Sequence, residues 1–136
     1  MSQVTISRSM LAESELPVYS GVSMARITLV DNAGLAERAM AELLAVPVIG
    51  FDTESKPTFQ KGEVSTGPHL VQLANDERVF LFPVLFAVNH EVLRRVLATP
   101  QVVKVGFGLG NDRTALRARL GIELNNVLDL GEVLRG

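Results

Sequence analysis

Residues 46–54, VPVIGFDTE, place two acidic side chains at the end of an apolar run. The apolar residues are continuous rather than alternating, which is typical of a strand covered on both faces. Residues i and i+2 of a strand project to the same side of the sheet, so Asp52 and Glu54 point together. Carboxylates this close repel each other unless a cation lies between them, and hard divalent cations prefer such oxygens. The stretch predicts a buried strand that ends in a candidate metal site.

The acidic triplet alone leaves a second interpretation open, because acidic residues are common. The strand could simply end at Asp52 and Glu54, with both side chains solvated. Glu13 and Glu15 form another such triplet, but no strand precedes them, and we interpret that pair as solvated surface. A further feature is needed to decide between a site and a strand end.

Asp112 supplies that feature, since it follows VKVGFGLGN (103–111), which predicts a strand, a glycine-rich turn and a helix start. Taken alone, an acid in the first turn of a helix is stabilised by the helix dipole. The glycines do not form G-x-G-x-x-G, because position 111 is Asn. The spacing therefore excludes the dinucleotide-binding fingerprint of a Rossmann fold.

The bulk composition describes one globular domain of 136 residues, with 47% apolar and 21% charged residues. The absence of cysteine excludes disulfides, thiolate metal sites and a cysteine nucleophile. The net charge of −2 argues against broad coating of a nucleic acid duplex. The N-terminus shows no signal-peptide pattern, and the longest apolar run, at 79–88, is too short to span a bilayer. We expect a cytoplasmic protein without a membrane partner; the oligomeric state stays open.

Helical and strand patterns interleave along the chain, which predicts an α/β fold with a sheet of mixed strand directions. The expected segments are an irregular stretch over 1–20, a strand at 25–30, a helix at 33–45 capped by Asp31 or Asn32, the strand at 48–54, a hairpin of strands at 70–75 and 78–82, a helix at 90–98 capped by Asn89, a strand at 102–108, a helix at 112–120 capped by Asn111 and ending at Gly121, a strand at 122–130, and a last helix that begins near 130.

Three stretches together resemble the DEDD superfamily of 3′–5′ exonucleases. VIGFDTESKP resembles its first motif, GPHLVQLAN the strand after that motif, and VKVGFGLGNDRTALRARLGIELNNVLDL its second motif. The chain is most similar to the exonuclease domain of the Werner-syndrome helicase and its small bacterial relatives, with RNase D near by. We therefore expect residues 21–136 to form an exonuclease-like domain whose C-terminal part is missing.

The resemblance implies a ribonuclease-H-like fold, a mixed β-sheet flanked by α-helices, with the motif acids gathered at one end. It implies that Asp52, Glu54 and Asp112 are catalytic and hold two Mg²⁺ or Mn²⁺ ions. Asp52 would contact both ions, Glu54 the ion that carries the attacking water, and Asp112 the other side of the site. In the two-metal mechanism, one ion activates water and the other stabilises the leaving 3′ oxygen. The product would be a nucleoside 5′-monophosphate.

The third motif of the family, a Tyr four residues before a fourth Asp, has no counterpart here. Tyr19 precedes the first motif, and Asp129 lies in the NNVLDL segment, where we interpret it as a strand-end residue near the site that is not a ligand. We expect the third motif to lie beyond Gly136 of a longer chain, and these 136 residues alone to have little or no exonuclease activity.

The expected partner is the 3′ end of a nucleic acid, with DNA and RNA both open. Lys56, Arg113 and Arg117 are the predicted contacts to its phosphates. Two other functions remain open: a non-catalytic nucleic-acid-binding or interaction module on the same fold, and an α/β domain whose acids only end strands.

Overall fold

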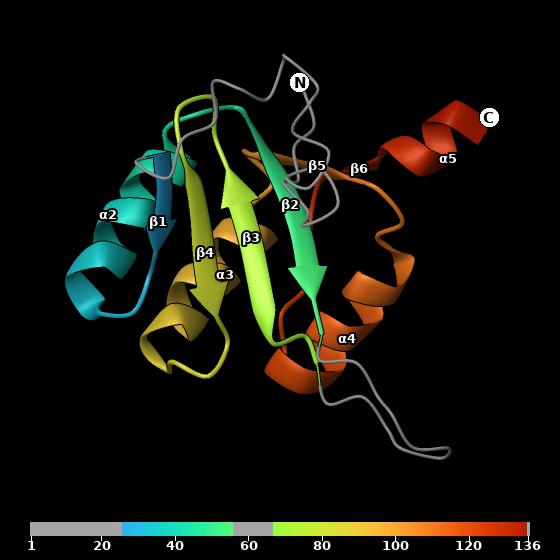
Figure 1. Cartoon of the computed structure of the whole chain (residues 1–136). Coiled ribbons are helices and arrows are strands. Elements are labelled where there is room, and N and C mark those ends of the chain that lie inside the picture. Colours follow the sequence, from blue (N-terminus) through green and yellow to red (C-terminus); the bar gives the residue numbers. More distant parts are fainter. Residues whose placement is uncertain (1–25, 56–66, 136) are drawn as a thin grey trace, which may run out of the picture.

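The fold is a mixed six-stranded sheet with helices packed against it, as seen in a computed structural model that describes residues 26–55 and 67–135 (Figure 1). In chain order the elements are β1 (Ile27–Leu29), α2 (Ala33–Leu44), β2 (Val48–Glu54), β3 (Leu70–Ala74), β4 (Val79–Pro83), α3 (Val88–Ala98), β5 (Val103–Gly106), α4 (Gly110–Leu120), β6 (Val127–Asp129) and α5 (Leu130–Arg135). The irregular segment expected over residues 1–20 lies outside the described residues.

The spatial order of the strands is β1-β4-β3-β2-β5-β6. Only β3 runs opposite to the other strands, because β3 is antiparallel to both of its neighbours and the remaining pairs are parallel. The expected hairpin is the β3–β4 pair, and its turn is closed by Asn75 Oδ1, which accepts from the backbone N–H groups of Glu77 and Arg78. The predicted fold class is confirmed.

One face of the sheet carries the hydrophobic core, and α2 and α3 lie behind that face in Figure 1. Ile49 and Phe51 of β2 project into this core and are almost fully buried. The buried members contributed by α3 are Val92, Leu93, Val96 and Leu97. Alternation along β2 consequently turns Asp52 and Glu54 to the opposite face. Burial of the apolar residues thus decides where the acids project.

Lys104 of β5 is an exception in this core, since its side chain is fully buried on the same face as Ile49. Its Nζ donates to the carbonyl oxygens of Thr99 (2.5 Å) and Val102 (2.8 Å). Burial lowers the pKa of Lys104 to about 8. The two carbonyl contacts satisfy the ammonium group and hold the α3–β5 connection against the strand.

Several predicted boundaries differ from the structure. Asn32 caps α2 as expected, with its Oδ1 2.9 Å from Leu35 N, and Gly121 (φ 64°) ends α4 as expected. Asn89 and Asn111, in contrast, lie inside α3 and α4, and Ala87 and Leu109 occupy the N-cap positions. Asn89 is instead fully buried and donates to the carbonyls of Val30 and Pro83. Its role is to hold α3 against the sheet.

The last strand is shorter than predicted, since β6 covers only Val127–Asp129 of the expected 122–130. Asn126 adopts a positive φ of 58°, a conformation that a strand does not accommodate. Ile122 and Leu124 are still buried, but from a loop rather than a strand. Among the residues that the structure describes, no helix is long and apolar enough to cross a membrane.

Candidate active site

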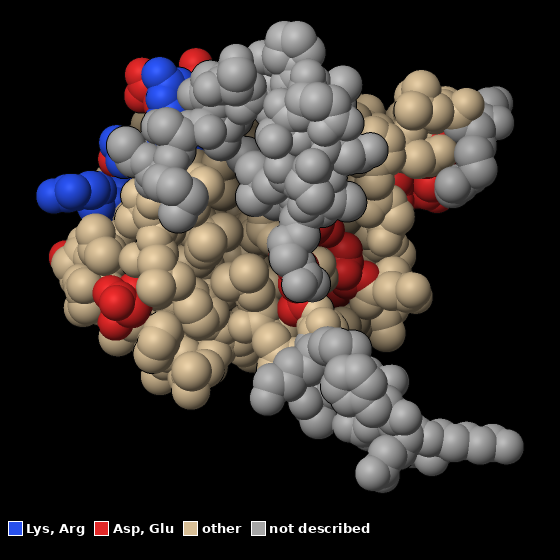
Figure 2. All heavy atoms as spheres, viewed as in Figure 1, with Lys and Arg blue, Asp and Glu red and all other residues tan. Residues whose placement is uncertain are grey.

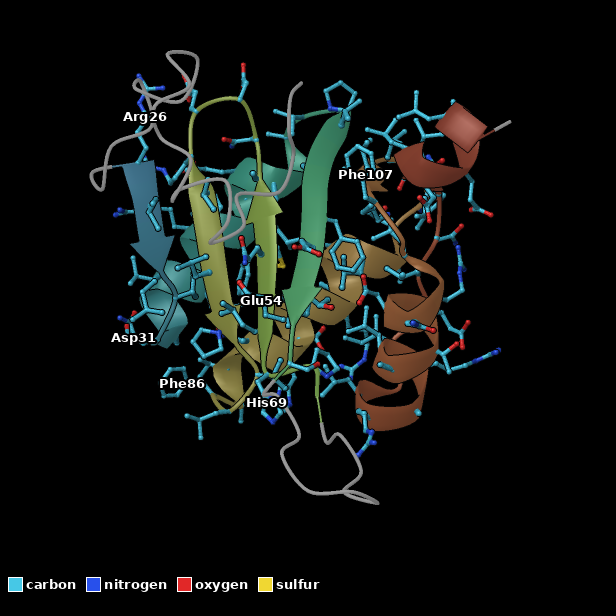
Figure 3. All side chains as sticks on the ribbon, turned by 45° about the vertical axis from the view of Figure 1, so that its right-hand side comes forward. Arg26, Asp31, Glu54, His69, Phe86 and Phe107 are labelled. Atoms are coloured by element: carbon cyan, nitrogen blue, oxygen red, sulfur yellow. The ribbon has the colours of Figure 1, made fainter. Side chains whose placement is uncertain are left out.

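The first two acids lie at the C-terminal end of β2, on the face away from α2 and α3. Asp52 is directly opposite Gln72 of β3, and Glu54 is opposite Leu70. In Figure 3, Glu54 lies over the lower part of the sheet, where β2 ends and β3 begins, with His69 below it. The predicted common side of Asp52 and Glu54 follows from this register.

Glu54 is held by its neighbour on β3, since Gln72 Nε2 donates to Glu54 Oε2 at 2.7 Å. Gln72 is only 4% exposed and Glu54 is half-buried, so this hydrogen bond is partly shielded from solvent. The carboxylate of Glu54 is therefore oriented by a residue of the sheet rather than left to rotate.

The third acid, Asp112, comes from the first turn of α4 and reaches β2 through Thr53. The Oγ1 of Thr53 donates to Asp112 Oδ1 at 2.5 Å. Thr53 projects to the opposite face from Asp52 and Glu54. The strand β2 thus carries two of the acids itself and binds the third, Asp112, through the hydroxyl of Thr53. Residues 59 positions apart in the chain are thereby brought together.

Asp129 fixes the turn that delivers Asp112. Its two carboxylate oxygens accept from the backbone N–H groups of Gly108 (3.0 Å), Leu109 (2.8 Å) and Gly131 (2.9 Å). These bonds lower the pKa of Asp129. The carboxylate of Asp129 is thus bonded to the backbone of the β5–α4 turn and of the start of α5.

The surroundings of Asp52 and Asp112 disfavour the ionised forms of these two acids. Burial raises the pKa of Asp52 to about 6, the N–H of Thr53 opposes the rise, and the charges of Asp112 and Glu54 add to it. Burial also raises the pKa of Asp112, against the hydrogen bond from Thr53 and together with the charge of Asp129. Opposed carboxylates with raised pKa values favour a cation as their partner.

Figure 2 shows red carboxylate atoms gathered between the end of β2 and α4, whereas the blue basic atoms visible on this face lie far away, beside β1. Carboxylate oxygens are the donors that Mg²⁺ and Mn²⁺ prefer. Within the described ranges, however, no three acidic or histidine side chains converge closely enough to hold a metal ion. The donor chemistry fits divalent cations, but the side chains are not gathered around one point.

Two of the three predicted phosphate contacts, Arg113 and Arg117, bond to groups outside this set of acids. Lys56 lies outside the described residues. Arg113 Nη1 donates to the carbonyl of Leu124 at 3.1 Å, and Arg117 Nε pairs with Glu123 at 2.6 Å in an exposed ion pair. The role of Arg113 and Arg117 in binding nucleic acid stays a prediction.

Two residues of the site, Thr53 and Gln72, were not predicted from the sequence. Gln72 did leave a signal, because it is the one polar residue of the apolar strand LVQLA. Thr53 left none, since a threonine in a strand is ordinary. Both contacts depend on pairing between distant segments, which local patterns do not reveal.

Comparison with known proteins identifies the class. The family model described as 3′-5′ exonuclease matches residues 27–134, so the chain belongs to this exonuclease family. The resemblance to the DEDD superfamily is thereby confirmed. Among curated proteins, none matches the chain by sequence.

Solved structures of similar fold agree with this assignment. RNase D of Trypanosoma brucei in complex with RNA U12 is 28% identical, with a TM-score of 0.69 over 76% of this chain and 37% of that one. The EXO domain of Nibbler from Aedes aegypti shares the fold at 23% identity, with a TM-score of 0.72 over 85% of this chain and 57% of that one. The EXD2 exonuclease domain, soaked in Mn and GMP, shares it at 19% identity, with a TM-score of 0.62 over 81% and 58%. The chain thus spans well under two thirds of these structures.

Proposed function

We propose that this domain belongs to a metal-dependent 3′–5′ exonuclease, which hydrolyses phosphodiester bonds at the 3′ end of a nucleic acid and releases nucleoside 5′-monophosphates. The observation that carries the proposal is the placement of Asp112 of α4 beside Asp52 and Glu54 of β2, where burial, and after it the charges of Asp112 and Glu54, raise the pKa of Asp52. Membership of the 3′-5′ exonuclease family supports the same activity.

In this proposal Asp52, Glu54 and Asp112 hold two Mg²⁺ or Mn²⁺ ions. Divalent cations, when bound, would activate water as the nucleophile and stabilise negative charge on the leaving 3′ oxygen. Soaking of the EXD2 domain with Mn supports this choice of ion. No side-chain nucleophile is required.

The remaining contacts prepare the acids for this task. Thr53 donates to Asp112 and thereby keeps one oxygen of that carboxylate turned to the strand. Asp129 binds the amides of Gly108 and Leu109, which fixes the turn ahead of α4. Because these groups are set by the sheet before substrate arrives, little reorganisation is left for the reaction itself.

RNA is the first substrate to test, because the T. brucei RNase D structure contains RNA U12. DNA is the second, since a contact to the 2′-hydroxyl would be needed to discriminate the two. A non-catalytic binding module on the same fold remains the competing function, and the absence of a gathered metal cluster among the described residues is the observation that favours it.

The test is digestion of a single-stranded RNA and a DNA of the same sequence, labelled at the 5′ end so that shortening from the 3′ end gives a ladder. The full-length protein that carries these residues should digest with Mn²⁺ or Mg²⁺ and stop with EDTA. Asp52→Asn should reduce the rate at least about 100-fold, as expected for a charge that acts at the reacting centre.

The matched control is Asp76→Asn, the same change in the exposed turn between β3 and β4, which should leave the rate unchanged. Binding of the labelled strands without digestion, equal in wild type and Asp52→Asn, would favour the non-catalytic module. Digestion that survives both EDTA and Asp52→Asn would contradict a metal-dependent site at β2.

A further inference from the structure

Gln72 is a polar side chain buried in the middle of an apolar strand. It is 4% exposed, and its Nε2 donates to Glu54 Oε2 at 2.7 Å. Its Oε1 is buried as well, and among the described residues it has no hydrogen-bond partner. A buried acceptor without a donor is unfavourable, so packing alone does not account for glutamine at this position.

The register of the sheet places Gln72 beside both acids of β2. Asp52 is its direct cross-strand partner, and Glu54 is the diagonal neighbour to which it is bonded. On the other side Gln72 is opposite Leu81 of β4. Side chains of such cross-strand pairs are in contact on one face of the sheet. Gln72 therefore lies beside Asp52 and Glu54, on the side where β3 pairs with β2.

Asn89 provides a contrast within the same chain. It is also fully buried, and its Oδ1 likewise has no partner within the described part of the chain. Its Nδ2, however, bonds the carbonyls of Val30 and Pro83, which joins α3 to the sheet. Gln72 donates instead to the carboxylate of Glu54. Asn89 therefore stabilises the packing of α3 on the sheet, whereas Gln72 contacts the candidate site.

We propose that Gln72 is a positioning residue for the cation site, an inference that rests on the proposed function. Its Nε2–H group restrains the carboxylate of Glu54, so that the site meets its cation with this ligand already oriented. Residues that orient ligands in this way typically contribute 10–100-fold to metal affinity, which sets the expected size of the effect, about tenfold or more.

The experiment compares Gln72→Met, an unbranched apolar replacement of similar length, with Asn89→Leu. Mn²⁺ binding to the whole protein is measured by calorimetry, and stability by urea unfolding in EDTA. Gln72→Met should weaken Mn²⁺ binding about tenfold or more and leave the urea midpoint unchanged or higher, because a buried unpaired acceptor is removed. Asn89→Leu should lower the midpoint and bind Mn²⁺ like the wild type.

Two outcomes overturn the inference: unchanged Mn²⁺ affinity in Gln72→Met, or a loss of midpoint as large as that of Asn89→Leu. The ¹⁵N spectrum of the Gln72 side-chain amide in metal-free protein provides an independent readout. Its resonances should move in Glu54→Ala and stay unchanged in Asp76→Asn.

If the wild type takes up no Mn²⁺, the proposed function fails, and the amide resonances still decide on Gln72. Resonances that do not respond to Glu54→Ala would show that no restraint of Glu54 exists, whatever the metal result. The failure of the inference is thus separable from the failure of the function.

Discussion

Asp52 connects the site to the pH dependence of stability. Its pKa in the folded chain is about 6, against the ordinary value of 3.8. Between these two values the folded state binds more protons than the unfolded state, so the free energy of unfolding falls as the pH rises through this window. Below the window Asp52 is protonated in both states, and the penalty disappears. The ionised form of Asp52 is therefore destabilising near neutral pH.

We predict that Asp52→Asn stabilises the metal-free protein at about pH 7.5. The raised pKa would correspond to about 3 kcal/mol, and the partial exposure of the side chain reduces this to about 1–2 kcal/mol. At about pH 4 most of the gain should vanish, because the wild-type carboxyl is then largely protonated. Urea unfolding in EDTA at both pH values measures the difference, with Asp76→Asn as the control. A gain that is the same at both pH values would show that the cause is not the titration of Asp52.

The placement of Asp52, Glu54 and Asp112 was predictable because it depends on local patterns, whereas their role as metal ligands stays a prediction. Alternation along VIGFDTE and the turn before Asp112 suffice to place three carboxylates at one end of a sheet. Thr53 and Gln72 were not predictable, because their partners, Asp112 and Glu54, lie 59 and 18 residues away along the chain. Such contacts depend on the strand register, which no short pattern contains.

At the scale of elements, the junction of β5 and α4 includes a close approach to the backbone of β2. A Cβ at Gly106 would clash with the backbone carbonyl oxygen of Phe51 on β2, whereas nothing lies within 4 Å of a Cβ at Gly110. Gly106 thus permits the close approach of two strands, and Gly110 has no such role.

Gly106→Ala should consequently destabilise the protein by about 1–3 kcal/mol, the range for forced overpacking. Gly110→Ala, four residues on, should be neutral or stabilise by up to about 1 kcal/mol, because alanine suits a helix and restricts the unfolded chain. Denaturant unfolding of both variants provides the measurement. Equal losses in the two variants would refute the assignment of the constraint to the β2–β5 contact.

Element boundaries show where sequence patterns stop being informative. Asn89 and Asn111 are good capping residues, yet their helices begin earlier, at Val88 and Gly110. Asn89 is drawn into the core because its amide reaches two backbone carbonyls there, which outweighs a capping bond at the helix end. Asn126, with its positive φ, likewise shortens β6. At Asn89, tertiary contacts overrode the local preference for a capping position.

The whole molecule presents no broad positive field, since 13 basic residues are set against 15 acidic ones. We predict a shallow salt dependence for binding of a single strand, with a slope of about −1.5 to −2 in a double-logarithmic plot, equivalent to two or three phosphate contacts. Fluorescence anisotropy between about 50 and 200 mM salt measures it. A slope of −4 or steeper would contradict the prediction.

Arg113 and Arg117 can be tested in the same titration. If one of them contacts a phosphate, its replacement by glutamine should reduce the slope by about 1. Arg94→Gln, on the exposed side of α3, is the matched control and should leave the slope unchanged. Unchanged slopes in both Arg113→Gln and Arg117→Gln would remove the two residues from the nucleic acid contact.

Lys104 gives the molecule a built-in chemical reporter. The chain contains three lysines, at positions 56, 61 and 104, and the ammonium group of Lys104 is enclosed and bonded to the carbonyls of Thr99 and Val102. An acylating reagent can reach that amine only when β5 separates from its surroundings. The rate at which Lys104 becomes modified therefore reports how often β5, the strand that precedes Asp112, separates from its surroundings. No engineered probe is needed for this measurement.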